Sequence, residues 1–62
     1  MGWRREIRDR IAELEQQRLQ LEEERRRARR HGGPQSERLE AELSAKLQQI
    51  GNYIDDLRAS LG

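Results

Sequence analysis

The densest group of chemically capable side chains lies in the segment EEERRRARRHGGPQSE, residues 22–37. From residue 25 to residue 38 there are six arginines against one acid, Glu37, so this stretch carries a local charge of +5. Guanidinium groups bind phosphate through two parallel hydrogen bonds, and clustered arginine is typical of proteins that bind nucleic acid or another polyanion. The candidate polyanion contacts are Arg25, Arg26, Arg29 and Arg30.

A second interpretation of the same segment needs no ligand. Glu22, Glu23 and Glu24 precede Arg25, Arg26 and Arg27 at spacings of three and four residues, which favour ion pairs along one helix. Arginines in the last turn of a helix also complement its dipole. The sequence therefore favours a solvated, salt-bridged helix end, and RNA or DNA binding at this segment is the alternative.

The remaining residue types do not predict an active site or a metal site. The chain has no cysteine and one histidine, His31, so a zinc centre built from thiolates and imidazoles is excluded. Asp55 and Asp56 are adjacent, and successive residues of a helix point about 100° apart. We expect a non-enzymatic protein without catalytic, cofactor-binding or metal-binding residues.

Composition bounds the class of protein. The 62 residues include 13 basic and 12 acidic side chains, for a net charge of +1. No apolar run approaches the ~18 residues of a membrane span, and the opening MGWRREIRDR lacks the apolar stretch of a signal peptide. The expectation is a soluble, intracellular (cytoplasmic) protein if the chain is natural, and a designed or engineered origin is also open.

Apolar residues recur at steps of three and four in two segments, which is the pattern of one helix face. The sequence predicts an all-α fold in which residues 1–62 form one domain, with helices at about 3–31 and 36–61 and a turn at about 32–35. Gly32 is expected to adopt a positive φ and Pro34 to prevent continuation of the first helix. Ser36 is the expected N-cap of the second helix.

A short turn makes the two helices antiparallel neighbours, with opposite residue numbers summing to about 66. Leu14 then falls between Ile50 and Ile54, so the two apolar stripes are in register. The same register predicts polar pairings across the helices. These are Arg25 with Glu40, Arg29 with Glu37, Glu24 with Lys46, and an unfavourable approach of Arg8 to Arg58.

The apolar stripe is wider than a two-helix seam. In heptads abcdefg with a and d apolar, Trp3, Leu39 and Tyr53 all occupy g positions, which a lone hairpin leaves in water. The sequence therefore predicts an antiparallel helical hairpin (a helical coiled coil) that pairs into a homodimeric four-helix bundle. The expected function is association, either with itself or with another amphipathic helix, and an isolated hairpin is the structural alternative. The predicted association interface comprises Trp3, Ile7, Ile11, Leu14, Leu21, Leu39, Leu43, Leu47, Ile50, Tyr53, Ile54, Leu57 and Leu61.

Gly51 is unusual because it lies inside the second predicted helix. Glycine costs about 1 kcal/mol there relative to alanine. Its presence is explained by a close approach of another helix, by a bend, or by random drift.

Overall fold

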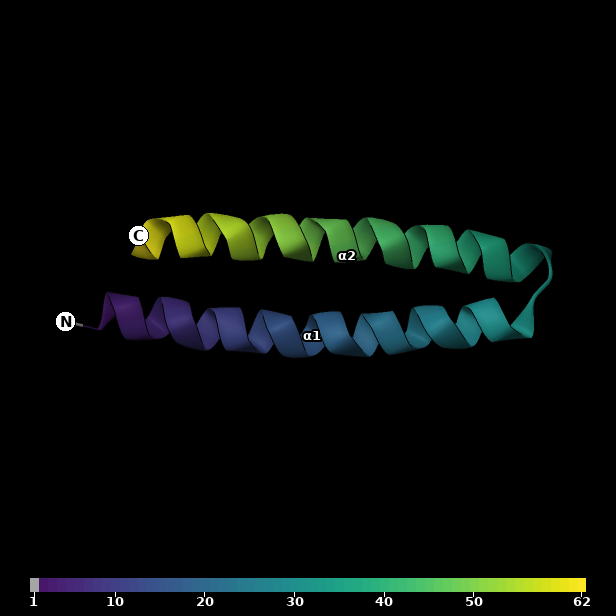
Figure 1. Cartoon of the computed structure of the whole chain (residues 1–62), viewed down its shortest axis with the longest axis horizontal. Helices are drawn as coiled ribbons and strands as arrows, with labels where there is room; N and C mark the ends of the chain where they lie inside the picture. The colour runs from purple at the N-terminus through teal and green to yellow at the C-terminus, as the bar shows by residue number, and fades with distance from the viewer. Residues whose placement is uncertain (1) are drawn as a thin grey trace.

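The computed structural model describes residues 2–62 as two helices, α1 (Trp3–His31) and α2 (Pro34–Leu61), joined by Gly32 and Gly33. The helices lie side by side and antiparallel, with both termini at one end of the molecule and the turn at the other (Figure 1). The hairpin measures 50 × 15 × 11 Å. The predicted all-α hairpin is confirmed, and residues 2–62 contain no strand.

The turn is built from two glycines in backbone conformations that other residues avoid. Gly32 has φ 67° and ψ 168°, and Gly33 has φ 103° and ψ 169°. This region of positive φ and extended ψ is essentially restricted to glycine. Two residues are thus enough to reverse the chain because neither carries a Cβ atom.

The start of α2 differs from the prediction. Pro34 is the first residue of the helix and Gly33 is its N-cap; the Gly33 carbonyl accepts hydrogen bonds from the backbone N–H groups of Ser36 and Glu37 at 3.1 and 3.3 Å. Proline is favoured at the first helical position because its missing N–H would have no partner there. The prediction that Ser36 caps this helix was wrong, since its hydroxyl instead donates to the Gly32 carbonyl at 2.8 Å.

The core lies mainly in the half of the hairpin away from the turn. Ile54 is 1% exposed and packs against Ile11 and Leu14. Burying a side chain of this size contributes about 1.5–3 kcal/mol. Four partly buried residues complete this cluster: Ile7, Ile50, Leu57 and Leu61. Leu43 and Ala28 are the buried residues nearer the turn, so the open half contains the larger apolar core.

Candidate association edge and arginine cluster

Three large side chains remain half exposed on the hairpin, and we call them the association edge: Trp3, Leu39 and Tyr53. Their exposed fractions are 51%, 45% and 50%. The other residues of the predicted interface are used within the hairpin itself. Four of these are buried, namely Ile11, Leu14, Leu43 and Ile54; six are partly buried, namely Ile7, Leu21, Leu47, Ile50, Leu57 and Leu61. The hairpin therefore leaves only part of the predicted interface available for a partner.

Leu19 is a further exposed apolar residue that the sequence analysis did not identify. It is 59% exposed and lies outside the stripe of three- and four-residue steps. Position 17 lies two heptads after Trp3 and so has the same heptad position. Leu19 is two residues further along α1, so its side chain points roughly 200° around the helix axis from that position. Single exposed leucines are common on protein surfaces, so Leu19 has no predicted role and serves as a comparison for the association edge.

Arginines accompany both aromatic side chains of the edge. The guanidinium carbon of Arg4 lies 5.5 Å from the centroid of the Trp3 ring, and that of Arg10 lies 6.0 Å from the Tyr53 ring. Such contacts contribute about 0.5–1 kcal/mol at exposed positions. Arg10 belongs to α1 and Tyr53 to α2, so this contact also joins the two helices. Each aromatic ring of the association edge therefore has a positively charged neighbour.

Charge is distributed unequally between the two helices. Between Glu42 and Asp55 the only charged residue of α2 is Lys46. In α1, by contrast, acidic or basic residues occupy most positions. The midpoint of α2 is consequently the least charged part of that helix, and the cations that a partner helix would meet there are Lys46 and, on the Tyr53 ring, Arg10.

Within residues 2–62, three ion pairs form. Arg29 Nε lies 2.8 Å from Glu40 Oε1, Arg58 pairs with Glu15 at 2.5 Å, and Arg10 pairs with Glu13 at 3.1 Å. All six side chains are accessible to solvent, so each pair contributes at most about 1 kcal/mol. Two of the pairs join α1 to α2 and help to fix the register of the hairpin.

These pairings correct the predicted ones. The proposed partners Arg25 for Glu40 and Glu37 for Arg29 were wrong, because Glu40 binds Arg29. Side chains lean toward the N-terminus of their own helix. In an antiparallel pair, α2 side chains therefore lean toward the turn and α1 side chains lean away from it. Two long polar side chains therefore meet when their Cα atoms are offset along the hairpin axis. A register that places Cα atoms directly opposite each other does not include this offset.

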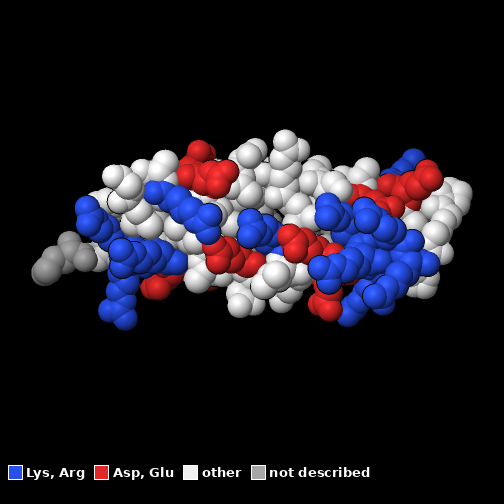
Figure 2. Space-filling view, viewed as in Figure 1, with Lys and Arg blue, Asp and Glu red and all other residues white. Residues whose placement is uncertain are grey.

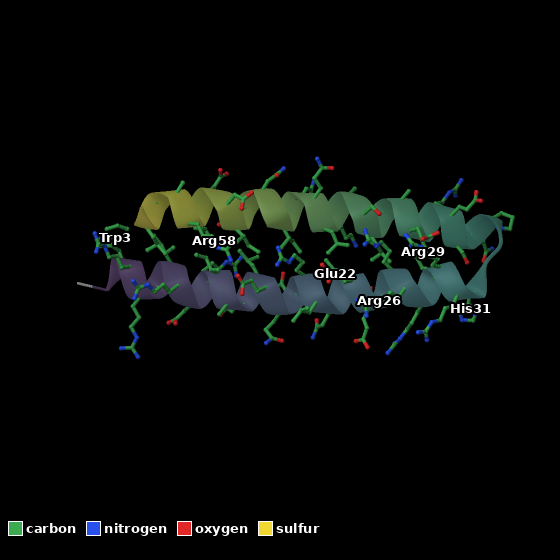
Figure 3. All side chains as sticks on the ribbon, in the orientation of Figure 1. Trp3, Glu22, Arg26, Arg29, His31 and Arg58 are labelled. Carbon is green, nitrogen blue, oxygen red and sulfur yellow. The ribbon has the colours of Figure 1, made fainter. Side chains whose placement is uncertain are left out.

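The same offset removes the predicted clash at the open end. Arg58 reaches along the hairpin to Glu15, and its side chain lies between the helices (Figure 3), so it is not held against Arg8. The predicted pair of Glu24 with Lys46 is absent from the ion pairs of residues 2–62. Both corrections concern flexible polar side chains and leave the apolar register unchanged.

The five arginines of residues 25–30, which we call the arginine cluster, belong to the basic surface toward the turn end of the hairpin (Figure 2). Of the four predicted polyanion contacts, Arg29 forms an ion pair with Glu40, and Arg25 is partly buried. Arg26 and Arg30 are exposed, as is Arg27. We call Arg26, Arg27 and Arg30 the outer arginines. In the described part of the chain no ion pair links Glu22, Glu23 or Glu24 to an arginine of the cluster, so the predicted salt bridges along α1 do not form.

One surface hollow belongs to this cluster. Arg27 and Arg30 line it together with His31, the last residue of α1. Figure 3 shows His31 beside the turn and Trp3 at the far end of α1. The hollow is open to solvent, and the three residues that line it all carry nitrogen donors in their side chains.

The described residues supply few other functional features. Residues 2–62 contain no group of three His, Asp or Glu side chains able to hold a metal ion. Neither described helix includes an apolar stretch with the length required to cross a bilayer. Comparison of the chain with protein-family models, curated protein sequences and solved structures found no significant match.

Proposed function

We propose that the hairpin is an association module and that its partner is a second copy of the same chain, with which it forms a four-helix bundle. The association edge is the observation that carries this proposal. Trp3, Leu39 and Tyr53 are each about half exposed, although they belong to the largest apolar side chains of the protein. Contact with the apolar face of a second copy would remove these three side chains from water.

The spacing of the edge supports a two-fold arrangement. Leu39 and Tyr53 lie seven residues on either side of Lys46, which is about 10 Å each way along α2. If two α2 helices cross antiparallel near Lys46, Leu39 of each copy lies opposite Tyr53 of the other. A two-fold axis makes this contact twice, because the same patch serves both copies. Trp3 would lie close to the turn of the second copy.

Charge favours the antiparallel arrangement over the parallel one. Residues 25–38 carry +5, whereas the whole chain carries +1. A parallel bundle would bring two such turn ends together, and like charges at close range repel. The antiparallel bundle places them at opposite ends of the assembly.

The expected association is weak. Fully burying a large apolar side chain contributes about 1.5–3 kcal/mol, and the edge residues are already half buried. Loss of translational and rotational freedom opposes association by an estimated 4–15 kcal/mol. Six half-exposed side chains, three from each copy, therefore support a dimer that dissociates on dilution.

Sedimentation equilibrium between about 1 µM and about 1 mM tests the proposal. The parent chain should change from monomer toward dimer across this range. Leu39→Glu and Tyr53→Glu should each shift the transition to higher concentration, because a carboxylate would have to be desolvated at the contact. Leu19→Glu is the matched control, since it introduces the same charge on a side chain that is at least as exposed.

The control decides between a specific edge and general hydrophobic association. An unchanged transition in Leu19→Glu together with a shifted one in Tyr53→Glu supports the edge. Equal shifts in all three variants would contradict it, and so would a parent chain that stays monomeric at the highest concentration.

A further inference from the structure

We infer that the outer arginines, Arg26, Arg27 and Arg30, bind the phosphate backbone of duplex nucleic acid. This binding is a separate activity from self-association, because a single hairpin carries all three side chains. The inference differs from the sequence-based alternative in its residues: it replaces Arg25 and Arg29 by Arg27.

The first support is the availability of the guanidinium groups. Arg29 donates to Glu40 at 2.8 Å, and Arg25 is partly buried. Arg26, Arg27 and Arg30 are exposed and take part in none of the three ion pairs of residues 2–62. Three arginines therefore face solvent with their donors free for an external anion.

Their placement on α1 is the second support. At 100° per residue, Arg26, Arg27 and Arg30 fall within a sector of roughly 100°, and Arg26 and Arg30 are about 6 Å apart along the axis. Arg27 and Arg30 also line one hollow with His31. The three side chains consequently share one outward face of α1, where they can contact neighbouring phosphates.

The dipole at the end of α1 opposes this binding, but it is offset by the positive N-terminus of α2 at the same turn and is outweighed by the side-chain charge. The C-terminus of α1 carries roughly half a negative charge. Residues 25–38 carry +5 and the rest of the chain carries −4, given a total of +1. A polyanion is thus attracted more strongly to the turn end than to the rest of the chain, which favours an approach with the turn toward the ligand.

The lack of Trp, Tyr or Phe side chains at the turn favours one type of nucleic acid. The aromatic residues of the described chain are Trp3 and Tyr53, on the association edge, and Trp3 lies at the opposite end from His31 (Figure 3). Single-stranded nucleic acid is held largely by bases stacked on aromatic rings. A duplex presents only its phosphates to a basic surface of this kind, so the binding should be independent of sequence.

Fluorescence anisotropy with a short labelled duplex DNA, titrated with the chain at several salt concentrations, tests the inference. Each phosphate neutralised lowers the logarithm of the association constant by about 0.9 per logarithm of salt. Three contacts predict a slope of about −2.7, so affinity should fall about 40-fold between about 50 and about 200 mM salt. Each single substitution, Arg26→Gln, Arg27→Gln or Arg30→Gln, should reduce the slope by about 0.9.

A matched triple variant separates a defined surface from net charge. Arg26→Gln/Arg27→Gln/Arg30→Gln should abolish binding, whereas Arg5→Gln/Arg8→Gln/Arg18→Gln makes the same change of charge on α1 outside residues 25–38 and should keep the parent slope. Circular dichroism would establish that both variants remain helical. Equal losses in the two triple variants would overturn the inference.

Two further outcomes would also overturn it. One is a lack of duplex binding at about 50 mM salt, where electrostatic attraction is strong. The other is binding of the chain to vesicles containing phosphatidylserine without binding to duplex DNA, which would assign the outer arginines to an anionic membrane surface.

Discussion

At the scale of single residues, Gly51 allows a test of whether another helix packs closely against α2. It lies inside α2, and a Cβ atom added there would meet no other atom within 4 Å. The close approach of a neighbouring helix considered for this glycine is therefore absent from the hairpin. Its position is roughly 200° around α2 from Tyr53, so the proposed dimer does not cover it either.

Gly51→Ala should accordingly stabilise the protein. Alanine is favoured over glycine in a helix interior by about 1 kcal/mol, which corresponds to a rise in melting temperature of about 4–8 °C for a chain of this size. Thermal denaturation followed by circular dichroism measures this change. Sedimentation should give an unchanged dimer constant. A lower melting temperature, or a weaker dimer, would show that a second copy packs against this position.

At the scale of the elements, periodicity predicted both helices and the turn because apolar spacing and the Gly-Gly-Pro sequence report directly on backbone conformation. Two features were not predictable in this way. Ser36 resembled an N-cap, but the preference of Pro34 for the first helical position started α2 earlier. The partner of Glu40 depended on the direction in which long side chains lean along the helix axis. Residue numbers alone do not predict that direction. The edge residues were identifiable from the heptad pattern, whereas the free state of Arg27 required the structure.

The turn offers a test of backbone strain, because Gly33 has φ 103° and open space around its Cα atom. Gly33→Ala should destabilise the hairpin by about 1–3 kcal/mol, the cost of holding an L-residue in this region. A synthetic chain with D-alanine at position 33 should recover the loss, since a D-residue favours positive φ. Equilibrium denaturation in urea measures all three chains. Equal stability of the L- and D-alanine forms would show that the turn relaxes to another conformation.

At the scale of the whole molecule, the two ends of the hairpin have different chemistry. The open half contains the core cluster of Ile11, Leu14 and Ile54, whereas the turn half carries most of the arginine cluster. Two residues of the association edge, Leu39 and Tyr53, lie along α2, and the third, Trp3, begins α1 at the open end. In the proposed antiparallel dimer, the two basic turn ends would point in opposite directions, so each could engage a separate polyanion while the midpoints of α2 remain in contact.

Cross-linking tests this orientation, because the chain has no cysteine of its own. Lys46→Cys would place a thiol on the proposed two-fold axis, where the two copies meet and a disulfide can form under oxidising conditions. Ser60→Cys is the matched control: it occupies the same heptad position, 14 residues from Lys46. In the antiparallel dimer its two copies would be about 42 Å apart along the axis, so no disulfide can join them. A parallel dimer would place each residue level with its own copy, so that the Ser60→Cys thiols could join as well as the Lys46→Cys thiols. Non-reducing electrophoresis should therefore show a covalent dimer for Lys46→Cys and a monomer for Ser60→Cys, and a covalent dimer of Ser60→Cys would exclude the antiparallel arrangement.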